Sequence, residues 1–216
     1  MKSHYALLFA VAAGLGAPAC GATAGQGPPI LQPGAPGQAG RTVTAAQAAD
    51  QSRVGHTPAD VRFMQGMIGH HAQAIEMTDL LKTRTTSEDM RKLALRIEIS
   101  QADEIGMMKA WLLARGEALP DPHAHHMPGM LMPGMLTPDE MARLASTKGP
   151  EFDRLFLEYM IKHHDGALIM VKDLFSTPGA GQEAEIFAFA SDVDADQAME
   201  IARMGAMLAM LKEQQK

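Results

Sequence analysis

The chain has 216 residues, of which 46 % are hydrophobic and 20 % charged, and its formal net charge is −6. This length and hydrophobic content suit one domain with a sizeable core and exclude a fibrous or wholly disordered protein. The acidic balance and the lack of a basic patch argue against nucleic acid or an anionic membrane as a partner. One cysteine, Cys20, excludes a disulfide framework and any zinc or iron–sulfur site built from cysteines.

The N-terminus has the features of a secretory signal peptide at residues 1–19. Lys2 precedes an apolar run from Tyr5 to Leu15, and small residues at 17–19 fit a cleavage site, so we expect export to the periplasm or cell envelope. The run is too short to span a bilayer. Cys20 follows it directly and is either a lipid anchor or a free thiol. Residues 20–56 are rich in Gly, Pro and Ala, which predicts a flexible linker.

Two helices are predicted between residues 57 and 116. Thr57-Pro-Ala-Asp60 is a helix start, and the apolar stripe behind it ends near 83–86. Ser87 caps a second helix that stops at Arg115-Gly116. The short connection between these two helices predicts an antiparallel hairpin.

The connector, residues 117–149, contains repeated Pro and Gly that forbid regular helix until Thr137 caps a short one. A third helix is predicted from about 150 to 175 and a fourth from about 182 to the C-terminus, forming a second hairpin over 150–216. No run alternates long enough to predict a strand. The fold class is therefore all-α, with two hairpins packed as a four-helix bundle in a 57–216 domain.

The two hairpins are duplicates. Residues 63–77 align without gaps on 156–170 with about half the positions identical, and residues 101–112 align on 197–208. Both copies contain Met-x-x-His-His. His70 and His163 fall in the apolar stripe, whereas His71 and His164 fall on its flank, so one histidine of each pair should face the core.

Buried imidazoles cost free energy unless a metal ion or a partner side chain satisfies them. Candidate partners stand at equivalent positions of the second and fourth helices: Gln101 and Glu104, and Gln197 and Glu200. The two glutamates can equally be solvated residues at the helix edge, and the sequence leaves both interpretations open.

Methionine is unusually frequent, since 18 Met outnumber Phe, Tyr and Trp together. Six of them have the spacing of core residues: Met67, Met77, Met108, Met160, Met170 and Met204. The connector has no such stripe, yet it holds His123, His125, His126, Met127, Met130, Met132 and Met135. Thioether and imidazole groups together suit copper, with Met favouring Cu(I) and His also accepting Cu(II). We therefore expect the connector to bind metal.

Three segments resemble the DUF305 family. They are Phe-Met-x-x-Met-Ile-x-His-His-x-x-Ala-Ile-x-Met at 63–77, Met-Pro-Gly-Met-Leu at 132–136, and Phe-Leu-x-x-Met-Ile-x-His-His-x-Gly-Ala at 156–167. The resemblance covers about 57–212. It implies a ferritin-like four-helix bundle, an exported bacterial protein and copper binding linked to copper resistance. The positions it implies as ligands are His70, His71, His163, His164, Met67, Met77, Met160, Met170 and the Met-Pro-Gly-Met methionines.

The leading hypothesis is an exported protein without catalytic activity that sequesters, buffers or transfers copper, with a copper-transport or efflux protein as a candidate partner. One alternative is an interaction module with an adaptable Met-rich surface. A second is a ferritin-like di-iron oxidase. The sequence disfavours that enzyme, because the first and third helices lack Glu-x-x-His and the hairpins share only Glu104 and Glu200 as carboxylates.

Overall fold

The computed structural model describes residues 29–32, 40–49, 55–121 and 131–214, and it divides into two compact units, Met1–Asp50 and Gln51–Lys216. In the first unit, strand β1 (Ile30–Gln32) pairs antiparallel with β2 (Arg41–Val43), with Ile30 opposite Val43, and helix α1 (Ala45–Ala49) follows. The prediction that no strand forms is therefore wrong within the 20–56 segment. Each strand has three residues, which is too few to show an alternating pattern.

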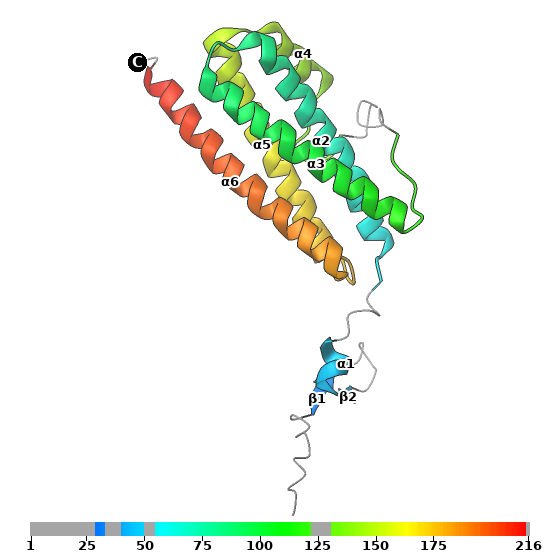
Figure 1. The fold of residues 1–216 in the computed structure, drawn as a ribbon. Helices are drawn as coiled ribbons and strands as arrows, with labels where there is room; N and C mark the ends of the chain where they lie inside the picture. The colour runs from blue at the N-terminus through cyan, green and yellow to red at the C-terminus, as the bar shows by residue number, and fades with distance from the viewer. Residues whose placement is uncertain (1–28, 33–39, 50–54, 122–130, 215–216) are drawn as a thin grey trace, which may run out of the picture. The chain divides into compact units, whose positions relative to one another are not determined.

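The second unit is mostly helical and contains the four long helices that the sequence predicts (Figure 1). Their bounds are α2 Pro58–Arg84, α3 Glu88–Ala114, α5 Gly149–Ser176 and α6 Ala184–Gln214, with the short α4 at Pro138–Ser146. Within the described residues, no helix combines the length and apolar character needed to cross a bilayer.

The predicted helix starts are confirmed by their hydrogen bonds. The Thr57 hydroxyl accepts from the Asp60 backbone N–H, and the Asp60 carboxylate accepts from the Thr57 N–H at 2.6 Å. Thr137 and Glu140 form the same reciprocal pair at the start of α4. Each box satisfies two backbone donors that a helix N-terminus otherwise leaves without partners.

Helix α2 packs on α3, α5 packs on α6, and α2 crosses α5 in the middle of the unit (Figure 1). Predicted stripe residues such as Phe63, Met67 and Leu81 are buried on α2, as is Ile97 on α3. The duplicated hairpins therefore meet through the helices that carry the histidines.

The end of the connector, residues 131–137, lies across α2 and α5, and we call it the strap. The Gln73 side chain donates to the Leu136 carbonyl at 2.9 Å and accepts from its N–H at 2.7 Å. Gly134 lies against Gly166, where an added Cβ would come within 2.6 Å of the Gly134 Cα. The Gln73 side chain of the first hairpin thus holds the strap by hydrogen bonds, and Gly166 of the second hairpin leaves room for it because it has no side chain.

Candidate metal centre

Four histidines form a row across the contact between α2 and α5. His70, His71, His163 and His164 are all 0 % exposed. The ring centroids of His70 and His163 lie 3.9 Å apart at the centre of the row. The outer rings are farther from their neighbours, with centroid distances of 6.3 Å from His70 to His71 and 6.2 Å from His163 to His164. The prediction that one histidine of each pair faces the core is too narrow, because α3 and α6 cover the flank on which His71 and His164 lie.

Two glutamates supply hydrogen-bond partners for the buried outer histidines, His71 and His164. His71 Nε2 lies 2.5 Å from Glu104 Oε2, and His164 Nε2 lies 2.6 Å from Glu200 Oε2. Of the two interpretations that the sequence left open, the one with glutamate partners is correct. Ser100 also donates to the other oxygen of Glu104. A carboxylate that holds an imidazole N–H is the usual orienting group behind a metal-binding histidine.

The neighbouring glutamines do not bond to the histidines. Gln101 and Gln197 are 1 % and 2 % exposed, and the Gln101 amide N and O and the Gln197 amide O have no hydrogen-bond partner among the described residues. The interpretation of these two glutamines as hydrogen-bond partners of the imidazoles is therefore wrong.

The strap fixes a third ring. His70 Nε2 lies 3.0 Å from the Pro133 carbonyl oxygen. A carbonyl and a carboxylate only accept, so Nε2 carries a proton in His70, His71 and His164. In the neutral form of each of these rings the lone pair is then on Nδ1. Sequence reasoning missed Pro133, because a contact made by a backbone carbonyl has no signature in residue types.

Five ring nitrogens are buried without a hydrogen-bond partner within the described residues: Nδ1 of all four histidines and Nε2 of His163. Leaving a buried polar atom unsatisfied costs about 1–3 kcal/mol. A row of four rings that bears this cost in both hairpins is unusual for a purely structural core. A neutral His163 carries a proton on one of its two ring nitrogens, so each neutral ring of the row offers one lone pair to a ligand.

Burial also keeps the two central rings uncharged. It lowers the pKa of His70 to about 3, with a further lowering from His71 and His164 that the Pro133 hydrogen bond partly opposes. The pKa of His163 is lowered well below its ordinary value, first by burial and then by the other three histidines, while the backbone of His70 acts weakly in the opposite direction. Both rings are therefore neutral at physiological pH, which is the state that binds a metal ion.

The methionines that the sequence singles out differ in burial and in their surroundings. Met67, Met77, Met108, Met160 and Met204 are 0 % exposed, as their spacing predicts, and Met170 is only partly buried. Met132 and Met170 lie over Gly66, where a Cβ would sit 3.2 Å from Met132 Sδ. Met135 is 4 % exposed, so this connector methionine has a packing role that the sequence did not indicate. His123, His125, His126, Met127 and Met130 lie outside the described residues.

The donor set fits a soft metal ion better than a hard one. Across the described ranges, no three His, Cys, Asp or Glu side chains are placed to hold a metal ion together. The groups at hand are imidazoles, with thioethers one helical turn away in the sequence at Met67 and Met160. Imidazole and thioether are donors that copper accepts, and a thioether can complete a set with fewer than three nitrogen or oxygen ligands.

Several solved structures are similar to this chain. A DUF305 protein from Streptomyces coelicolor is 33 % identical, with a TM-score of 0.61, and the match covers 71 % of this chain and 94 % of that one. A DUF305 fragment from Deinococcus radiodurans is 31 % identical, with a TM-score of 0.61, and the match covers 72 % of this chain and 98 % of that one. No curated protein sequence matches significantly.

The copper protein CopM in its Cu(II)-bound form is also similar, with 27 % identity over 69 % of this chain and 95 % of that one and a TM-score of 0.57. Its Cu(I)-bound and Ag-bound forms match with TM-scores of 0.53 and 0.54. The model of the family described as "Domain of unknown function (DUF305)" matches residues 60–208, a range that contains both histidine pairs and both of their glutamates. The chain therefore belongs to the DUF305 family.

Proposed function

We propose that this protein is exported and binds copper, which it sequesters, buffers or transfers without chemical conversion. The binding site is the histidine row, with methionine thioethers as additional donors and Cu(I) as the preferred ion. Cu(II) is the second candidate, because imidazole accepts both oxidation states. The leader-like residues 1–19 support export.

The observation that carries the proposal is the set of unpartnered ring nitrogens in the fully buried histidine row. Glu104, Glu200 and the Pro133 carbonyl hold three of the rings in the tautomer whose Nδ1 is free. A metal ion that bound these atoms would remove the cost of leaving them unsatisfied. The copper- and silver-bound forms of CopM support the choice of a soft ion.

We also propose that the four long helices form a ferritin-like bundle. The support is the connectivity: a short turn within each hairpin and one long connection, residues 115–148, between them. A single long crossover distinguishes ferritin-like bundles from those joined only by short loops.

The test is a competition titration of the metal-free full chain against a chromophoric Cu(I) chelator. The double variant His70→Gln with His163→Gln keeps polar side chains of similar size in the row, and we expect it to lose at least about tenfold in affinity, as for the loss of metal ligands or of their supports. His56→Gln is the matched control, because His56 is partly exposed and lies away from the row. A further variant replaces residues 122–130 with a Gly/Ser linker.

Unchanged affinity in the His70/His163 variant, together with loss in the linker variant, would place the copper site in the connector and overturn the proposed centre. No binding by any form would exclude copper and leave the interaction module as the better hypothesis. Iron-dependent oxygen consumption by the full chain would favour the di-iron alternative.

A further inference from the structure

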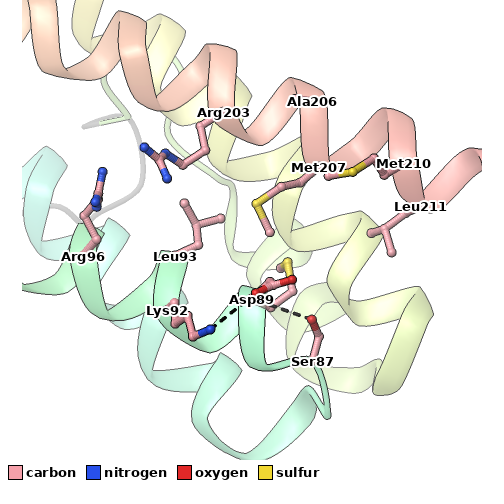
Figure 2. A pocket seen from close by; sticks show the side chains of 11 residues that line it. Ser87, Asp89, Lys92, Leu93, Arg96, Arg203, Ala206, Met207, Met210 and Leu211 are labelled. Carbon is pink, nitrogen blue, oxygen red and sulfur yellow. Dashed lines mark hydrogen bonds and ion pairs between the residues drawn. The ribbon is translucent and has the colours of Figure 1, made fainter.

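Two grooves lie between α3 and α6, one at each end of this face. The first has a volume of about 590 Å³ and lies between the first half of α3 and the last third of α6, with Leu93 and Met207 in its walls (Figure 2). The second has a volume of about 530 Å³ and lies between the end of α3 and the start of α6, with Trp111 and Phe189 in its walls. This arrangement shows that α3 and α6 run antiparallel along the face.

The two grooves are equivalent under the internal duplication. Gln101 aligns with Gln197, a shift of 96 residues. The same shift carries Leu93 and Arg96 of the first groove onto Phe189 and Asp192 of the second, and it carries Trp111 onto Met207. Equivalent residues therefore line the two grooves, and apolar side chains contribute to both. Each also leaves a methionine more than half exposed: Met210 at 54 % in the first and Met107 at 56 % in the second.

Their charges are opposite. The first groove is lined by Lys92, Arg96 and Arg203, with Asp89 as its one acidic residue (Figure 2). The second groove has Glu185 and Asp192, and its one basic residue, Arg115, pairs with Glu183 and Glu185. At the equivalent positions Arg96 and Asp192 the sign is reversed.

We propose that a second copy of this chain docks on the α3–α6 face, with the first groove of each copy on the second groove of the other. A two-fold axis that lies in the face and crosses the helices at right angles produces this arrangement. It places α3 over α3 and α6 over α6 in antiparallel directions, so that Arg203 of each copy comes toward Asp192 of the other. The face follows all of α3, which is about 40 Å long by the helix rise, and this length accommodates an interface of standard size. Complementary charge at both ends selects this orientation over its reverse, which would bring basic residues together.

Carboxylates in the middle of the α3–α6 face oppose the docking of a second copy. The pKa of Asp196 is raised by burial and then by Glu104, Glu200 and Asp192, so carboxylates gather between the two grooves. In the dimer they face the same residues of the other copy. The apolar and charged contacts at the ends must outweigh this repulsion, and we therefore expect reversible association rather than a permanent dimer.

Sedimentation equilibrium of the metal-free full chain over a range of concentrations tests the proposal. We expect the average mass to rise from one chain toward two. Arg203→Asp and Asp192→Arg each place like charges together at both ends, and each should raise the dissociation constant roughly tenfold or more. The double variant exchanges the charges and should restore association. Lys172→Asp, an exposed site on α5 outside both grooves, is the control for the change in net charge.

All three substituted side chains are in exposed positions, and thermal unfolding of each variant verifies the fold. A chain that stays monomeric at every concentration overturns the proposal and leaves the face to a different partner. Association that survives both single variants, or that the double variant does not restore, also overturns it. The inference is independent of copper, because Cu(I) titration of the same variants should be unchanged whatever their mass.

Discussion

Glu104 and Glu200 each accept one imidazole N–H and thereby leave Nδ1 of His71 and His164 as the lone-pair atom. Replacing a carboxylate with an amide weakens this selection, because an amide can donate as well as accept. We expect Glu104→Gln to lower Cu(I) affinity about 10–100-fold, the usual loss when the partner of a metal-binding histidine is changed. The measurement is the chelator competition described above.

Glu98→Gln is the matched control for that variant, since Glu98 lies on the same helix and contacts Lys82 rather than a histidine. Equal affinities of Glu104→Gln and the native chain would show that Glu104 holds His71 for packing alone. A change in the control as large as in Glu104→Gln would show that the loss reflects the net charge of α3.

The uncharged state of the central histidines makes stability depend on pH. An unfolded chain takes up a proton on His70 near pH 6.5, whereas the folded chain does not until about pH 3. Between these values the unfolded state binds more protons, so the free energy of unfolding falls as the pH is lowered, by roughly 1.4 kcal/mol per pH unit for each such histidine. His163 acts in the same direction.

Urea unfolding of the metal-free chain at pH 7, 6, 5 and 4 measures this dependence. Carboxylates also titrate at the acid end, so the informative quantity is the difference between the native chain and His70→Gln, in which the glutamine can still donate to Pro133. We expect a shallower slope in the variant between pH 6 and pH 4. Parallel slopes would mean that His70 is protonated in the folded protein.

Among the helices, the strap depends on a glycine of α5. A Cβ at Gly166 would lie 2.0 Å from the Pro133 carbonyl oxygen, the atom that holds His70. Gly166→Ala should therefore displace the strap and destabilise the protein by about 2 kcal/mol or more, as for overpacking at a buried site. Amide hydrogen exchange at residues 134–136 should accelerate at the same time.

Gly205→Ala is the matched control, because nothing lies within 4 Å of a Cβ at that position of α6. Helix propensity then acts alone, and we expect stabilisation by about 0.5–1 kcal/mol. If both variants behaved alike, the close approach of the strap would not contribute to the fold.

The same elements show how far sequence reasoning reaches. Helix ends followed from local chemistry, such as the Thr57 and Thr137 capping boxes, and were predicted within a few residues. The strap was not predicted, because its contacts join residues far apart in sequence. Its signal lies in the positions where the duplicated helices differ: Gln73 clamps the strap where α5 has Gly166, and Gly66 makes room for Met132 where α5 has Tyr159.

At the scale of the whole helical unit, the site depends on the contact between two hairpins that supply equivalent groups. Each hairpin alone provides a histidine pair and one glutamate, but the row of four rings exists only where α2 meets α5. The burial of His71 and His164 could not be predicted from the pattern of one helix, because the glutamates that contact them come from α3 and α6. A metal ion held by both hairpins should therefore stabilise the folded state as a whole.

Thermal unfolding with silver ions, a redox-inert substitute for Cu(I), measures that stabilisation. At a free concentration 100 times the dissociation constant, a ligand that binds only the folded state stabilises it by about 2.7 kcal/mol. We expect this shift in the native chain, none with Mg²⁺, and a much smaller one in the His70→Gln/His163→Gln variant. Tight binding without a shift in melting temperature would contradict a site between the hairpins, because ligands that lie close together in sequence bind the unfolded chain as well.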